Sequence, residues 1–116
     1  MARFLFVYRG DKDAGAQMTP AQMQEMLKQW GDWIAAAMKD GWMVDSGDAL
    51  TPEGKVLRGA NVVLDGPFVE SKEVLGGYSV VEAESIDAAA KLARGCPALR
   101  GGSVEVRRLA GFALKM

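Results

Sequence analysis

The first apolar segment of the chain, residues 3–9, alternates between two faces. Such alternation places successive side chains on opposite sides of a β-strand. One face is aromatic and consists of Phe4, Phe6 and Tyr8; the other is aliphatic and consists of Leu5 and Val7. Because both faces are apolar, we predict a strand that is covered on both sides.

A second pattern, with apolar residues three and four positions apart, begins after Thr19 and predicts a long helix. The apolar positions are Met23, Met26, Leu27, Trp30, Ile34, Ala37 and Met38, with Trp33 beside them. Thr19 and Gln22 have the spacing of a capping box, and Pro20 suits the first helical position. Gly41 is a typical residue after a helix end. We expect the Met and Trp side chains of this helix to lie in the core.

The rest of the chain carries shorter patterns that predict five more strands and a second helix. We expect strands over residues 42–50, 55–58, 61–65, 76–83 and 103–109, and the second and third of these form a hairpin across Gly59-Ala60. Ser85 is expected to cap the second helix, and Gly95 and Pro97 to end it. The inner side of this helix is expected to consist of Ile86, Ala89, Ala90, Leu92 and Ala93.

The elements follow one another in the order β-α-β, hairpin, β-α-β, which predicts a single domain over residues 1–116. Two helices of this length cannot cover both faces of a four-stranded sheet. We therefore expect an α+β fold of the ferredoxin-like type, with an antiparallel sheet and both helices on one face. The uncovered side, called the open face below, then carries Leu5 and Val7. A homodimer that covers the open face is the simplest remedy.

The composition excludes several kinds of site and partner. The chain has 116 residues, a net charge of −1 and no histidine. A balanced charge is unlike a nucleic-acid-binding surface. Without histidine we expect no transition-metal site and no cofactor, although carboxylates alone can bind Mg²⁺ or Ca²⁺.

The cysteine count and the N-terminus indicate the compartment. Cys96 is the single cysteine, so an internal disulfide cannot form and a reducing compartment fits. Cys96 also lacks a histidine to activate it, and we propose no nucleophile there. The first apolar run is too short for a signal peptide or a membrane span. We expect a cytoplasmic protein without a membrane partner.

Four motifs occur in order: Asp65-Gly66-Pro67-Phe68, Glu70-Ser71-Lys72-Glu73, Leu75-Gly76-Gly77-Tyr78 and Gly102-Ser103-Val104-Glu105-Val106-Arg107. Together with the N-terminal strand, they resemble the YCII-related or DGPF domain family over nearly the whole chain. The resemblance implies a ferredoxin-like dimer, often described as a dimeric α+β barrel. It implies no settled function: some members are suspected enzymes with a His–Asp pair in the cleft, relatives include a muconolactone-type dehalogenase, and others are linked to transcription initiation. Because this chain has no histidine, a His-dependent mechanism does not transfer to it.

Asp65 and Lys72 are candidate site residues in the motif region. Asp65 is a candidate catalytic base if burial in a cleft raises its pKa. Its alternative role is that of a turn residue that accepts backbone hydrogen bonds. Lys72 is a candidate for binding Asp65 or an anionic ligand, and its alternative is a solvated pair with Glu73.

Glu105 and Arg107 share one face of the last strand, opposite Val104 and Val106. Because the valines should meet the helices, we expect the charged pair on the open face, inside the dimer. Glu105 is then a candidate catalytic carboxylate, and Arg107 a candidate anion-binding residue. The alternative is a structural salt bridge that sets the dimer register.

Two functions from different classes fit these residues. The first is binding of a small anionic molecule in a dimer cleft, either passively or with metal-independent acid–base catalysis of the lyase or isomerase type at Asp65 or Glu105. Tyr8 and Trp42 are candidates for lining that cleft, with core or interface packing as the alternative. The second is a non-catalytic interaction or regulatory module, linked to transcription initiation through a protein partner. The charged pair in an apolar sheet favours a ligand site, whereas the missing histidine weakens catalysis.

Overall fold

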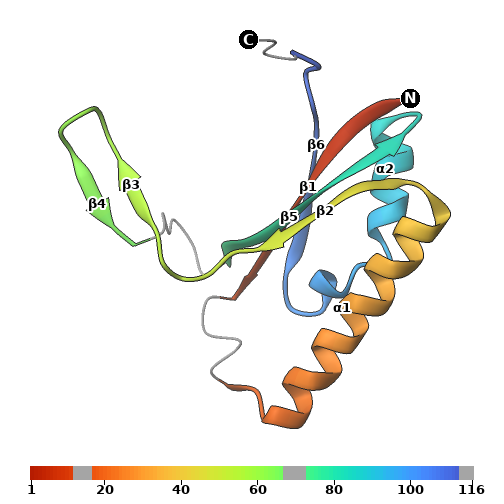
Figure 1. Cartoon of the computed structure of the whole chain (residues 1–116), viewed down its shortest axis with the longest axis horizontal. Coiled ribbons are helices and arrows are strands. Elements are labelled where there is room, and N and C mark those ends of the chain that lie inside the picture. Colours follow the sequence, from red (N-terminus) through yellow and green to blue (C-terminus); the bar gives the residue numbers. More distant parts are fainter. Residues whose placement is uncertain (12–16, 67–72, 113–116) are drawn as a thin grey trace.

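The computed structural model describes residues 1–11, 17–66 and 73–112 of the chain (Figure 1). Its strands are β1 (Ala2–Asp11), β2 (Met43–Ala49), β3 (Lys55–Leu57), β4 (Val63–Asp65), β5 (Glu73–Ala83) and β6 (Ser103–Arg108). Its helices are α1 (Pro20–Asp40) and α2 (Ile86–Ala93), followed by the short 3₁₀ helix η2 (Pro97–Leu99). The predicted strands and helices are confirmed, and only their bounds differ by a few residues.

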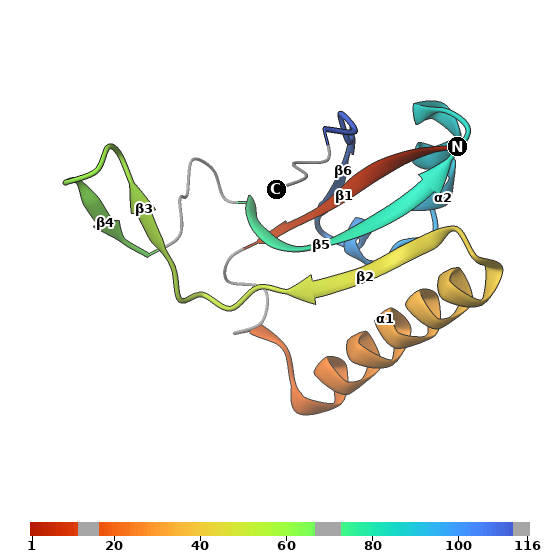
Figure 2. The same cartoon turned by 45° about the horizontal axis from the view of Figure 1, so that its top comes forward.

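Four strands form one antiparallel sheet in the order β2-β5-β1-β6, and β3 and β4 form a separate hairpin. Both helices lie on one side of the sheet, and the hairpin lies on the other side (Figures 1 and 2). Each helix connects two strands that are separated by a third, which allows both helices to share one face. The α+β fold with an antiparallel four-stranded sheet and two helices is therefore as predicted.

Both helix starts are capped as the sequence predicts. Thr19 Oγ1 accepts a hydrogen bond from Gln22 N at 3.1 Å, and Gln22 Oε1 accepts one from Thr19 N at 3.0 Å. Ser85 Oγ accepts a hydrogen bond from Ala88 N at 3.1 Å. At the end of α1, Gly41 adopts a left-handed conformation with φ of 84°. These contacts satisfy backbone groups that the helix itself leaves without partners, so the ends of α1 follow from local sequence.

The core lies between the helices and the sheet face that they cover. Phe4 and Phe6 on β1 are fully buried and Tyr8 is 8% exposed, which confirms the predicted aromatic face. The Tyr8 ring packs edge-on against Trp30 of α1, with 4.8 Å between ring centroids. An aromatic cluster connects Phe6, Tyr8, Trp30, Trp33 and Trp42. Edge-to-face packing of this kind adds to the stability that burial alone provides.

Four side chains that the helical patterns predict inside are exposed. Leu27, Met38 and Ile86 have exposed fractions of 60%, 47% and 51%, and Ala90 of α2 is exposed as well. The first half of α1 extends past the end of the sheet, so part of its apolar stripe has no strand to pack on (Figure 1). On α2, the buried residues are the small Ala89 and Ala93, and the larger Ile86 lies at the rim. The prediction that these four residues lie on the inner side of their helices was wrong.

Candidate functional site

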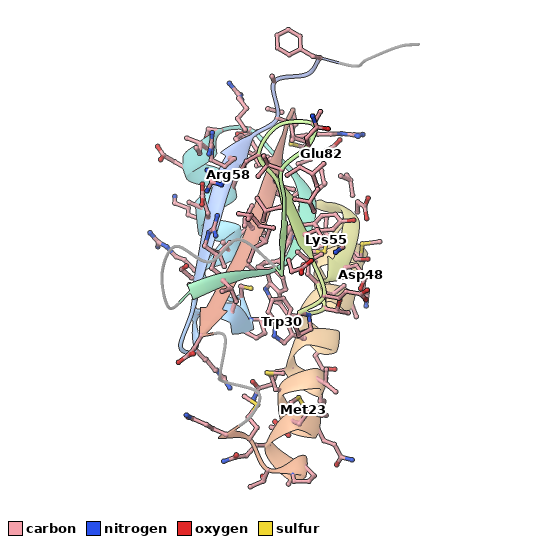
Figure 3. The ribbon with its side chains drawn as sticks, turned by 90° about the vertical axis from the view of Figure 1, so that its left-hand side faces the viewer. Met23, Trp30, Asp48, Lys55, Arg58 and Glu82 are labelled. Carbon is pink, nitrogen blue, oxygen red and sulfur yellow. The ribbon has the colours of Figure 1, made fainter. Side chains whose placement is uncertain are left out.

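The open face of the sheet has an apolar centre. Leu5 and Val7 on β1 point away from the helices, and they pair in register with Val80 and Tyr78 on β5. Leu5, Val7 and Val80 are half-buried, and Tyr78 is 39% exposed. Figure 3 views the molecule from the side of this face. The expectation that β1 is apolar on both sides, with one side uncovered by helices, is met in the single chain.

A cluster of three charged residues borders this apolar centre on β1 and β6. Glu105 pairs in register with Val7, and Arg107 with Leu5, so both belong to the open face as predicted. Glu105 Oε2 lies 3.2 Å from Arg107 Nη1, and Glu105 Oε1 lies 3.4 Å from Arg9 Nε. Two guanidinium groups therefore share one carboxylate. We call these three residues, Arg9, Glu105 and Arg107, the arginine cluster.

The electrostatics of the arginine cluster favour an ionised carboxylate. The hydrogen bond from Arg107, together with the hydrogen bond and charge of Arg9, lowers the pKa of Glu105, although some desolvation opposes the shift. In the single chain the side chains of Arg9, Glu105 and Arg107 are 39%, 40% and 71% exposed. The cluster is thus a solvent-accessible group whose positive charges are only partly balanced by its own carboxylate.

The other long edge of the sheet is acidic. Asp45 and Asp48 on β2 pair in register with Val80 and Tyr78, and both aspartates are exposed. Their carboxylates accept backbone hydrogen bonds within β2, from Gly47 N and Ala49 N respectively, each at 2.8 Å. The open face therefore has an acidic edge at β2 and an arginine-rich edge at β6.

The other sequence candidates do not join the arginine cluster. Asp65 is 91% exposed and pairs with Lys55 Nζ at 2.8 Å within the hairpin, which stands apart from the sheet (Figure 1). Lys72 lies outside the described residues. Tyr8 and Trp42 lie on the helix-covered side, in the aromatic cluster, and do not line a cleft with Glu105 and Arg107.

Tyr8 instead anchors a buried polar contact in the core. Its hydroxyl donates to Ser79 Oγ at 2.8 Å, and Ser79 Oγ donates to the backbone carbonyl of Ser46 at 2.7 Å. Burial raises the pKa of Tyr8 well above its ordinary value, and the hydrogen bond with Ser79 only partly opposes this. Tyr8 is therefore neutral at physiological pH and connects β1 to β5.

Arg9 is the site residue that the sequence analysis missed. It ends the predicted strand, and its odd position gives it the same facing as Leu5 and Val7. The alternation of side chains, which predicts Glu105 on the open face, could therefore also have predicted Arg9 there. What the sequence alone does not provide is the register in which β1 pairs with β6, which brings Arg9 and Glu105 together.

A separate cavity of about 410 Å³ lies on the helix side, between α1 and the segment that follows α2. Its lining includes Gln29, Trp33, Arg94, Cys96 and Arg100. Arg100 donates a hydrogen bond to Gln29, which ties the two segments together. Burial raises the pKa of the Cys96 thiol to about 11, so the thiol is protonated near neutral pH.

Within residues 1–11, 17–66 and 73–112, no three Cys, Asp or Glu side chains lie together in a way that would hold a metal ion. In the same parts of the chain, neither helix is long and apolar enough to cross a membrane.

Comparison with known proteins identifies the family. No curated protein matches the chain. The family model of the YCII-related domain matches residues 3–113, which include β1 from its second residue onward, the strands β2 to β6, both helices and the arginine cluster. The motif-based resemblance is thereby confirmed, and the chain belongs to the YCII-related domain family.

Proposed function

We propose that this protein is a homodimer that covers its open face with a second copy and binds a small anionic molecule at Arg9 and Arg107. The observation that carries the proposal is the arginine cluster, in which two guanidinium groups share the single carboxylate of Glu105 at the border of an apolar sheet face. Guanidinium groups bind carboxylates and phosphates through paired hydrogen bonds.

The apolar centre of the open face supports the dimer. Leu5, Val7, Tyr78 and Val80 form a contiguous patch by their register. Sheets that pack face to face lie about 10 Å apart and interdigitate such side chains. Burial of this patch would contribute roughly 25 cal/mol for each Å² of apolar surface removed from water.

The charges at the two edges of the sheet favour one symmetry. A two-fold axis parallel to the strands stacks the β2 edge of one copy on the β6 edge of the other. Asp45 and Asp48 of one copy then lie on the same side as Arg107 of its partner, and the interface is isologous. Such complementarity selects the register of association more than it adds affinity.

Covering the open face creates the need for a bound anion. An arginine cannot lose its proton, and a charge that is removed from water must be paired. Glu105 can balance only one of the two guanidinium groups. A small carboxylate or phosphate would balance the other, and Asp45 or Asp48 of the second copy is the competing source of negative charge.

Binding is better supported than catalysis. A general acid needs a carboxyl group whose pKa is raised toward the working pH, and the pKa of Glu105 is shifted the other way. Asp65 is exposed on the hairpin, away from the arginine cluster. The alternative, a regulatory module that binds another protein through the same face, predicts no small ligand.

A ligand screen with matched arginine variants tests the proposal. Inorganic phosphate and short mono- and dicarboxylates are titrated while the thermal unfolding temperature is measured for wild type, Arg107→Met and Arg94→Met. We expect at least one anion to stabilise wild type and Arg94→Met but not Arg107→Met. Loss of the effect only in Arg94→Met would assign the site to the cavity beside α1 instead. Stabilisation of none of the three proteins would refute small-anion binding.

A further inference from the structure

The hairpin of β3 and β4 lies outside the compact body of the molecule. The radius of gyration is 15.7 Å, whereas a globular domain of this length has one of about 13 Å. Figures 1 and 2 both show the hairpin apart from the four-stranded sheet, on the side opposite the helices. We call residues 55–65 the arm.

The arm exposes an unusual amount of apolar surface for its size. Leu57, Val62, Val63 and Leu64 have exposed fractions between 45% and 61%. A two-stranded hairpin is at best marginally stable in water without a surface to pack on. Exposed apolar strands are also sites of unwanted association, which proteins normally avoid. These four apolar side chains of the arm are therefore left largely exposed by the part of the chain that the structure describes.

The arm is nevertheless held in a defined shape. Lys55 and Asp65 form an ion pair at its base, and Gly66 N donates to the carbonyl of Gly54 at 2.6 Å. At its tip, Arg58 N donates to the carbonyl of Val62 at 2.8 Å. A closed hairpin of this kind is a preformed binding element rather than a loose loop.

We propose that the arm packs against the second copy of the chain and clasps the dimer. Seen from the side of the open face, the arm lies in front of the sheet (Figure 3). A second sheet stacked about 10 Å in front of the open face would occupy the same side of the molecule as the arm. The two-fold symmetry of a dimer then gives two equivalent arms, each of which buries its apolar residues on the partner.

This inference rests on the proposed dimer, to which it adds a structural element. It commits to a second copy as the occupant because the arm and the apolar centre of the open face lie on the same side of the fold. The dimer interface that covers Leu5 and Val7 would continue onto the arm. A different protein as the occupant is an outcome of the test below.

Removal of the arm is feasible because its ends already meet. Since Gly54 and Gly66 are hydrogen-bonded to each other, residues 55–65 can be replaced by an Asn-Gly turn. Two milder variants each change the apolar residues on one face of the arm. Leu57 pairs with Val63 and Val56 with Leu64, so the two double variants are Leu57→Ser with Val63→Ser, and Val56→Ser with Leu64→Ser. Ile86→Ser, at an exposed apolar residue of α2, is the matched control.

The dimer dissociation constant is measured by sedimentation equilibrium, and circular dichroism reports folding. We expect the arm replacement and at least one double variant to weaken the dimer about tenfold or more, whereas Ile86→Ser leaves it unchanged. A wild-type dimer that is equally tight without the arm refutes the clasp but leaves the proposed dimer intact. A monomeric wild type refutes both, and would favour a different protein as the occupant.

Discussion

The carboxylate of Glu105 lies between two arginines, with Oε1 at 3.4 Å from Arg9 Nε and Oε2 at 3.2 Å from Arg107 Nη1. The alternation of side chains along the last strand predicts the pair of Glu105 and Arg107. Arg9 adds a second guanidinium group to this pair. A salt bridge between one arginine and one glutamate has no net charge. This cluster has two guanidinium groups and one carboxylate, so one positive charge can pair with a further anion. The proposed binding of an anion depends on this relationship.

The first prediction concerns the pH dependence of the arginine cluster. The pKa of Glu105 is lower in the folded chain than its ordinary value of about 4.3. The folded state thus binds fewer protons, so Glu105 stabilises it above this ordinary value, and the contribution is lost as the pH falls through the lowered pKa. The free energies of unfolding of wild type and Glu105→Gln, measured with urea, should therefore differ near neutral pH and converge as the pH falls through the lowered pKa of Glu105. A difference that is independent of pH would contradict the ion pairing.

The second prediction separates an exposed pair from one that a dimer buries. A double-mutant cycle with Glu105→Gln and Arg107→Met should give strong coupling when the dimer forms. The same cycle in a chain made monomeric by Val7→Lys should give weak coupling, because exposed pairs contribute little. Equal coupling in both backgrounds would mean that the cluster lies outside the interface.

The third prediction concerns the buried hydroxyl of Tyr8. Tyr8→Phe removes the hydrogen bond to Ser79 and should cost about 0.5–1.5 kcal/mol near neutral pH. Because the pKa of Tyr8 is raised in the folded state, its stabilising effect is complete below the ordinary value of about 10 and is lost as the pH rises above it.

Denaturant unfolding at alkaline pH tests whether this stabilising effect of Tyr8 is lost as the pH rises. Wild type should lose stability above about pH 10, and Tyr8→Phe should lose less. Tyr78→Phe, on the exposed side of the sheet, is the control and should retain the alkaline loss. If both variants behave like wild type, Tyr8 does not titrate on unfolding as described.

The fourth prediction compares two apolar residues, each of which belongs to an apolar pattern in the sequence. Phe6 is fully buried, whereas Leu27 is 60% exposed on the part of α1 that extends past the sheet. Phe6→Ala should cost about 3–5 kcal/mol, because it leaves a cavity in the core. Leu27→Ala should cost about 1 kcal/mol or less. Chemical denaturation of both variants measures the difference, and similar losses would show that α1 is covered along its first half.

Much of the fold could be predicted because its signals are local. The alternation around Phe4 and Phe6 defines β1, and the hydrogen bonds of Thr19 and Ser85 define where the helices begin. The limits of the core are not local. The apolar stripe of α1 runs through Leu27, but periodicity contains no information on where the sheet beneath a helix ends.

The candidate site was predictable in part for the same reason. Glu105 and Arg107 reach the open face by alternation alone, whereas the role of Arg9 depends on the pairing of β1 with β6. Tyr8 has the same facing as Phe4 and Phe6, and this excludes it from the open face. For Asp65, the sequence predicts a hairpin strand correctly, yet nothing local indicates that the hairpin leaves the sheet.

The most direct test of the central claim is the mass of the protein in solution. Sedimentation equilibrium of wild type and of Val7→Lys, at micromolar concentration, asks whether a second copy covers the open face. We predict a wild-type dimer and a folded Val7→Lys monomer, because a lysine would place an unpaired charge at the centre of the apolar patch. A monomeric wild type, or a Val7→Lys dimer as tight as wild type, would contradict the account.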